Sequence, residues 1–150
     1  MFDLQDLYQD IVMDHNRRPR NFGVLNDATF TADGFNPLCG DQITLYLKVE
    51  DNIVTNVAFD GVGCAISKSS ASMMTDSIKG MTLEKVDGVF NAFRSMITRR
   101  PEDDYDSEIL GDLEILQGVS RYPARIKCAT LSWHTLRAAL TQSEDTITTE

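Results

Sequence analysis

The order of apolar and polar residues predicts a helix at the start of the chain and a β-hairpin after it. Residues 3–15 carry apolar side chains at the three- and four-residue spacing of an amphipathic helix, with Asp3 as its N-cap and Pro19 beyond its end. Residues 43–49 and 53–59 instead alternate between apolar and polar, and Asp51-Asn52 separates the two runs. A weaker strand is predicted at residues 28–32, before a turn-rich segment at 33–37.

Helical patterns fill the second half of the chain. They predict helices at residues 65–79, where the first half has unusually small side chains, at 83–97 and, as a short helix, at 111–116. A last helix begins at Pro123 and has a stripe of core-facing residues, namely Ala129, Trp133, Leu136 and Leu140. Residues 99–108 are predicted to form a polar loop, and residues 141–150 a polar, frayed tail.

Early strands and late helices indicate an α+β fold. We expect a small antiparallel sheet of about three strands with helices packed on one face. The chain has 150 residues, and no linker or repeat divides it, so residues 1–150 are predicted to form a single domain with its polar tail at about 141–150.

Charge and cysteine content limit the function classes. The chain has 23 acidic and 14 basic residues, a net charge of −9 and a pI near 4.6, which disfavours nucleic acid as a partner because phosphates attract basic surfaces. The apolar runs are far shorter than the ~20 residues of a membrane span, so no membrane association is expected. Three cysteines cannot all pair, and no leader pattern precedes the first helix. We therefore expect a cytoplasmic protein with free thiols, and protein or metal partners.

The three cysteines lie where predicted elements begin. Cys39 precedes the first hairpin strand, Cys64 precedes the helix with small residues, and Cys128 lies in the first turns of the last helix. A helix N-terminus favours thiolate, although buried, inert cysteines are the commoner case. Asp41 projects to the same side of an extended segment as Cys39. Three thiolates and one carboxylate suit tetrahedral Zn²⁺, and they would equally hold an iron–sulfur cluster.

Two basic residues near Cys128 bear on the charge of such a site. Three thiolates and a carboxylate around a divalent cation leave a net negative charge, which Arg125 and Lys127 are placed to offset. Arg125 is the better candidate because it lies one turn before the cysteine. Either residue is equally compatible with a solvated helix face.

Several motifs, taken together, resemble the IscU/NifU-like family of iron–sulfur cluster assembly scaffolds. The resemblance runs from about residue 5 to about residue 140. Its main motifs are Asn36-Pro37-Leu38-Cys39-Gly40-Asp41, Phe59-Asp60-Gly61-Val62-Gly63-Cys64-Ala65-Ile66-Ser67 and Pro123-Ala124-Arg125-Ile126-Lys127-Cys128-Ala129.

Three departures from the isc-type scaffolds resemble the SufU branch of the family. Lys127 stands where those scaffolds have histidine, Ser120-Arg121-Tyr122-Pro123-Ala124 replaces their chaperone-binding stretch, and residues 99–113 form an insertion. The SufU branch consists of zinc-dependent sulfurtransferases that take persulfide sulfur from a cysteine desulfurase.

The resemblance implies a site and partners for this chain. It implies that Cys39, Asp41, Cys64 and Cys128 bind zinc, that Cys39 accepts the sulfur and that Arg125 stabilises the Cys39 thiolate. It also implies a SufS-type cysteine desulfurase as partner, with the SufBCD assembly complex as a further one. The alternative implied by the same family is a scaffold that assembles a [2Fe–2S] or [4Fe–4S] cluster on these residues and transfers it.

Overall fold

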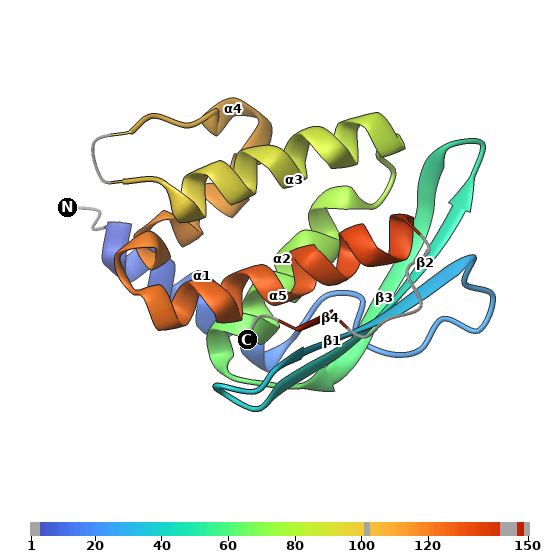
Figure 1. Cartoon of the computed structure of the whole chain (residues 1–150), viewed down its shortest axis with the longest axis horizontal. Helices are drawn as coiled ribbons and strands as arrows, with labels where there is room; N and C mark the ends of the chain where they lie inside the picture. The colour runs from blue at the N-terminus through green and yellow to red at the C-terminus, as the bar shows by residue number, and fades with distance from the viewer. Residues whose placement is uncertain (1–3, 101–102, 142–146, 149–150) are drawn as a thin grey trace.

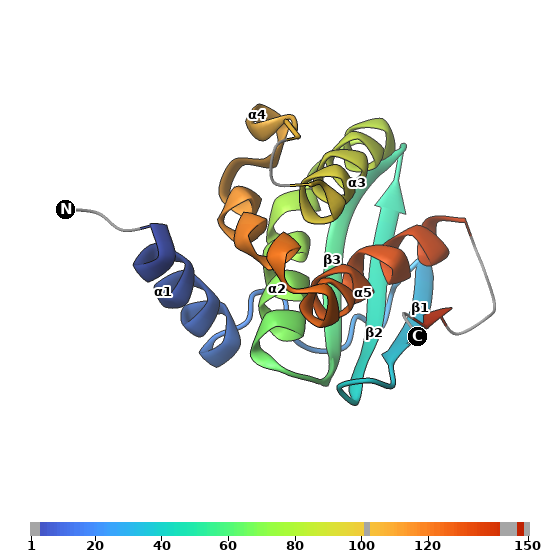
Figure 2. The ribbon, with the colours of Figure 1, turned by 60° about the vertical axis from the view of Figure 1, so that its left-hand side comes forward.

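The computed structural model describes residues 4–100, 103–141 and 147–148. Figure 1 shows a sheet with helices gathered on one of its faces, and Figure 2 shows the two layers separated, with α1 farthest from the sheet. The helices are α1 (Leu4–Arg17), α2 (Ala65–Ile78), α3 (Leu83–Thr98), α4 (Ser107–Leu110), the 3₁₀ helix η1 (Gly111–Arg121) and α5 (Pro123–Leu140). The strands are β1 (Phe30–Asn36), β2 (Asp41–Glu50), β3 (Ile53–Val62) and β4 (Ile147–Thr148).

The sheet has the order β3-β2-β1-β4. β2 pairs antiparallel with β1 and β3, which confirms the predicted α+β fold with three antiparallel strands. The hairpin between β2 and β3 turns at Asp51 and Asn52, whose φ angles of 51° and 66° match the left-handed conformation of a tight two-residue turn. Side chains of β2 alternate between buried and more exposed positions, as the sequence pattern predicts.

Two local predictions are wrong. Residues 33–36 of the predicted turn-rich segment belong to β1, which pairs with β2 as far as Asn36 and Asp41. A Cβ atom at Gly34 would collide with Thr135 Oγ1 of α5, so this glycine serves close packing of a helix rather than a turn. Within the predicted frayed tail, Ile147–Thr148 form β4 and pair parallel with Gly34 and Phe35, while residues 142–146 and 149–150 lie outside the described residues.

α4 and η1 replace the predicted short helix at 111–116. Gly111, with φ 54°, interrupts the helical path after Leu110. Four of the buried apolar residues of α4 and η1 recur at a spacing of three, and this is the repeat of a 3₁₀ helix, in which side chains three apart are eclipsed. They are Leu110, Leu113, Leu116 and Val119.

The serine-rich face of α2 allows its neighbours to approach closely. Ser69 Oγ donates a hydrogen bond to the Val12 carbonyl of α1 at 2.7 Å, and Ser70 Oγ donates to the Ala129 carbonyl of α5 at 2.6 Å. Ser70 Oγ also accepts a bond from Trp133 Nε1 at 3.2 Å. The two bonds of Ser70 hold α5, the helix that carries Cys128, against α2. No helix in the described ranges is both long enough and apolar enough to span a membrane.

Candidate metal centre

The four candidate ligands come from three places at one end of the sheet. Cys39 lies in the turn between β1 and β2, next to Gly40 with φ 71°, and Asp41 is the first residue of β2. Cys64 is the N-cap of α2, and Cys128 lies in the second turn of α5. The β1–β2 turn and two helix N-termini therefore converge here.

Three of the four candidates are close enough to share one ion. One ligand atom each from Cys39, Asp41 and Cys128 lie within 4.8 Å of one another, and the Cys39 and Cys128 sulfurs are 3.4 Å apart. Cys128 and Asp41 are buried, whereas Cys39 is exposed. The group thus has one solvent-facing thiol in front of two buried ligands.

Cys64 lies beside this group, and its sulfur also serves the start of α2. Its Sγ accepts a hydrogen bond from Ser67 N at 3.4 Å and caps α2. Its backbone N–H donates to Asp41 Oδ1 at 2.8 Å, so the Cys64 backbone is held against the site. The structure brings together three of the four predicted ligands, and Cys64 remains a predicted ligand.

Asn36 is a residue of the site that the sequence did not reveal. Its Nδ2 donates to Asp41 Oδ2 at 3.0 Å and to Cys128 Sγ at 3.6 Å, and the side chain is fully buried. Because a carboxylate only accepts hydrogen bonds, the amide nitrogen must face Asp41. The signal available in the sequence was register, since Asn36 pairs with Asp41 across the β1–β2 turn.

Burial controls the protonation of Cys128. Desolvation, followed by hydrogen bonding with Cys39 and the negative charge of Cys64, raises the pKa of the Cys128 thiol well above its usual range. The sequence led us to expect that the start of the last helix would favour thiolate at Cys128, whereas burial acts in the opposite direction. A bound cation reverses this preference, since metal coordination deprotonates a thiol.

Arg125 lies against the thiols, as its place one turn before Cys128 suggested. Hydrogen bonding with Cys128 and the nearby charges of Cys64 and Cys39 raise the pKa of its guanidinium. The side chain is otherwise exposed to solvent. A permanent positive charge therefore stands beside a site built from anionic ligands.

The donor set fits zinc. A tetrahedral site with Zn–S distances of ~2.3 Å separates two sulfur ligands by roughly 3.8 Å, and the 3.4 Å between Cys39 and Cys128 needs only a small adjustment. The Asp41 carboxylate is buried and has a direct bond to Asn36 on one oxygen and to Cys64 N on the other. Thiolates with one carboxylate also suit iron, so the donor set alone leaves the cluster alternative open.

Comparison with known proteins places the chain in a family. The sequence model of the NifU-like N-terminal domain matches residues 7–129. The chain belongs to the NifU-like N-terminal domain family. The chain is 48% identical over 142 residues to the zinc-dependent sulfurtransferase SufU of Bacillus subtilis, and the match covers 95% of each chain. It is also 38% identical over 134 residues to the iron–sulfur cluster assembly scaffold protein IscU of Thermotoga maritima, which covers 89% of this chain and 92% of the relative.

A solved structure shares the fold of this NifU-like domain. The crystal structure of FiSufU, a SUF-system iron–sulfur cluster assembly scaffold protein from Fervidobacterium islandicum AW-1, superposes with a TM-score of 0.83. The two sequences are 31% identical, and the match covers 91% of this chain and 98% of the other. The family resemblance inferred from the cysteine motifs is confirmed.

Proposed function

We propose that this protein is a zinc-dependent sulfurtransferase of the SufU type, which accepts persulfide sulfur from a cysteine desulfurase for iron–sulfur cluster biogenesis. The observation that carries the proposal is the asymmetric ligand group, in which an exposed Cys39 lies 3.4 Å from the buried Cys128 and next to the buried Asp41. The 48% identity to SufU over 95% of the chain supports zinc as the cofactor.

The four proposed ligands bind zinc, and one of them, Cys39, also accepts the sulfur. Asp41, Cys64 and Cys128 hold the zinc together with Cys39, and zinc is redox-inert and keeps its cysteine ligands as thiolates. Cys39 is the sulfur acceptor because it is the exposed thiol and lies in a turn that contains Gly40. The Cys39 thiolate attacks the outer sulfur of the partner's persulfide, a new S–S bond forms on Cys39, and the partner's cysteine leaves as a thiolate. No electrons are gained or lost overall.

Arg125 stabilises the Cys39 thiolate before it reacts. Its guanidinium lies among the three thiols, where hydrogen bonding with Cys128 is the largest influence on it. A charge-assisted hydrogen bond from arginine is roughly twice as strong as a neutral one, which favours the anionic form of a nearby thiol.

Exposed apolar side chains around the site support a protein partner. Leu38 next to Cys39 is 61% exposed, Val62 close to Cys64 is 67% exposed, and Tyr122 at the start of α5 is 62% exposed. Such side chains at the rim of a reactive site are suited to burial in an interface. In this proposal a SufS-type desulfurase docks here, and the SufBCD assembly complex receives the sulfur afterwards.

Desulfurase turnover with Cys39→Ala tests the acceptor role. We expect the zinc-loaded wild type to stimulate alanine release from cysteine and to gain the mass of one sulfur atom on Cys39. Cys39→Ala should lose both effects. Ser95→Ala, which also removes one γ atom from an exposed position, is the matched control and should behave as wild type. Stimulation by Cys39→Ala at the wild-type rate would contradict the proposal.

Metal content separates this function from the cluster scaffold alternative. One zinc per chain without visible absorbance supports the sulfurtransferase. An oxygen-labile coloured cluster that forms in anaerobic preparations, and that can be transferred to an apo-ferredoxin, would instead support the scaffold.

A further inference from the structure

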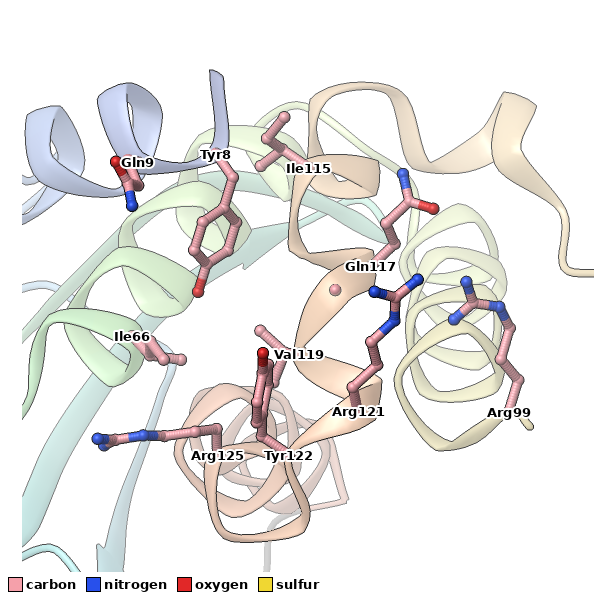
Figure 3. Close-up of a pocket in the computed structure, with 11 residues that line it drawn as sticks. Tyr8, Gln9, Ile66, Arg99, Ile115, Gln117, Val119, Arg121, Tyr122 and Arg125 are labelled. Carbon is pink, nitrogen blue, oxygen red and sulfur yellow. The ribbon is translucent and has the colours of Figure 1, made fainter. Parts of the chain in front are cut away.

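An open cleft of about 430 Å³ lies beside the metal centre. Residues of α1, α2, α5, η1 and the end of α3 line it (Figure 3). Its floor is apolar and includes Ile66, Ile115 and Val119, and its rim is polar. This volume and this mixture of surfaces are typical of pockets that bind small molecules, which are usually ~300–1,000 Å³.

The cleft is positively charged on a strongly acidic protein. Arg99, Arg121 and Arg125 line it, and no aspartate or glutamate is among the lining residues whose side chains the structure describes, although the whole chain has a net charge of −9. None of the salt bridges found within the described ranges involves these arginines. Positive charge with no carboxylate opposite it indicates an anionic ligand, because arginine forms paired hydrogen bonds with carboxylates.

Two arginines lie at one end of the cleft. Figure 3 shows the guanidinium groups of Arg99 and Arg121 at the same end, next to Gln117. Arg99 is fixed in place, since its Nη1 donates to the Met96 carbonyl at 2.9 Å and to Ser120 Oγ at 3.1 Å. The same guanidinium lies 4.7 Å from the centre of the Tyr105 ring. Both bonds use Nη1 of a guanidinium group that has five N–H donors, so the side chain is held in place while its other N–H donors remain available to a ligand.

The opposite end of the cleft lies toward the metal centre. Arg125 lies at this end, together with Ile66 and the hydroxyl group of Tyr8 (Figure 3). The thiols of Cys128, Cys64 and Cys39 together raise the pKa of the Arg125 guanidinium, and Ile66 is two residues after Cys64 at the start of α2. Cys39 is 3.4 Å from Cys128 and exposed. A molecule that binds along the cleft would therefore have its anionic end at Arg99 and Arg121 and its other end near Cys39.

We propose that this cleft binds a low-molecular-weight thiol that carries carboxylate groups, and that this thiol takes the transferred sulfur from Cys39. The inference rests on the proposed function, because it requires a persulfide on Cys39. A thiol fits because the ligand must present a nucleophile at the Cys39 end and an anion at the arginine end. The cleft would give the protein a small-molecule route for releasing sulfur, in addition to transfer to a protein.

The transfer balances without any further reactant. The ligand thiolate attacks the outer sulfur of the Cys39 persulfide, and a new S–S bond forms on the ligand. The bond between Cys39 Sγ and the outer sulfur breaks, and Cys39 leaves as a thiolate. The ligand thiol loses one proton when it becomes a thiolate, and the Cys39 thiolate takes up one proton after it leaves. One sulfur atom therefore moves from the persulfide to the ligand thiol with no net oxidation.

Binding is tested with S-methylglutathione, which keeps both carboxylates and whose blocked sulfur cannot act as a thiolate ligand. Calorimetric titration into zinc-loaded protein should give saturable binding, and Arg121→Gln should weaken it about tenfold or more. Arg17→Gln, an exposed arginine of α1 outside the cleft lining, is the control with the same charge change and should bind as wild type. Equal binding of the diethyl ester, equal competition by inorganic phosphate, or unchanged binding by Arg121→Gln would each overturn the proposal.

Transfer is tested on protein whose Cys39 persulfide has been formed chemically with polysulfide, so that no desulfurase is needed. Glutathione should remove the sulfur at least several-fold faster than its diethyl ester, and Arg121→Gln should abolish this preference. Equal rates for the two thiols with wild type would refute the cleft proposal and leave the proposed function intact. Failure of a desulfurase to load Cys39 would instead refute the proposed function, while the binding result would still stand.

Discussion

Replacing Gly63 with alanine should weaken metal binding through a single added methyl group. A Cβ atom at this position would be 2.9 Å from Asp41 Oδ1 and 3.3 Å from both Cβ and Cγ of Asp41. The φ angle of Gly63 is outside the left-handed region, so alanine is tolerated by the backbone and the effect comes from the contact alone. Since 2.9 Å is shorter than carbon–oxygen contacts allow, either the carboxylate or the backbone must move.

The carboxylate has little freedom to move. Asp41 is fully buried, and its two oxygens accept bonds from Cys64 N at 2.8 Å and Asn36 Nδ2 at 3.0 Å. Displacing it breaks at least one of these bonds, and disturbing the partners of a metal ligand typically costs 10–100-fold in affinity. We therefore expect zinc affinity to fall by about 10–100-fold, which is about 1.4–2.7 kcal/mol.

Competition against a chromophoric zinc chelator measures this change. Gly118→Ala is the matched control, because a Cβ atom there meets no heavy atom within 4 Å, and its zinc affinity should equal that of wild type. Circular dichroism establishes that both variants are folded. If folded Gly63→Ala binds zinc as tightly as wild type, Asp41 is not a ligand in the position described here.

Three further changes test the surroundings of the site. Ser70→Ala leaves Trp133 Nε1 and the Ala129 carbonyl without their bonds and should destabilise the fold by about 1–3 kcal/mol in urea unfolding, whereas the exposed Ser95→Ala should be nearly neutral. Asn36→Ala removes the donor to Asp41 and Cys128, so zinc affinity in the chelator assay should fall at least about tenfold; an unchanged affinity would exclude a supporting role for Asn36. Hydrogen bonds from Arg20 and Arg18 lower the pKa of Asp14 from 3.8 to about 2, so their stabilising effect is complete above the unfolded value and is lost as pH falls toward 2. Asp14→Asn should therefore unfold at lower urea than wild type at pH 7 and at the same urea near pH 2; a constant difference would contradict this assignment.

Local patterns predicted most elements of this fold because their ends are marked by local chemistry. The helix predicted at residues 65–79 is α2 at Ala65–Ile78, and the one predicted at 83–97 is α3 at Leu83–Thr98. Thr82 caps α3 by accepting a bond from Lys85 N, and threonine directly before a helix is a common N-cap. A cap or a turn depends on neighbours in the chain, so one sequence is enough to find it.

Features that depend on distant contacts were not predictable in the same way. Gly34 suggested a turn, but its lack of a side chain is used by Thr135, about a hundred positions later in the chain. The 3₁₀ helix is an intermediate case, since the three-residue spacing from Leu110 to Val119 is visible in the sequence but was interpreted as an ordinary short helix.

The candidate site also combines features that one sequence can predict with features that depend on distant contacts. Cysteine positions and the Cys39-Gly40-Asp41 spacing suggested the candidate ligands, and three of these candidates, Cys39, Asp41 and Cys128, lie together. The sequence did not indicate that the sulfur of Cys64 caps α2, nor that burial raises the pKa of Cys128. Both depend on how α2 and α5 pack on the sheet.

The bonds of the Asp41 carboxylate have a consequence for how metal enters and leaves. Its two partners, Asn36 Nδ2 and Cys64 N, belong to the protein, so the bonds that join the β1–β2 turn to the start of α2 are made by the chain itself. Folding alone therefore builds this framework, and loading zinc requires no reorganisation of the chain behind it. Metal exchange is then kinetically separate from unfolding, and zinc should pass to a competing chelator much faster than the whole protein unfolds.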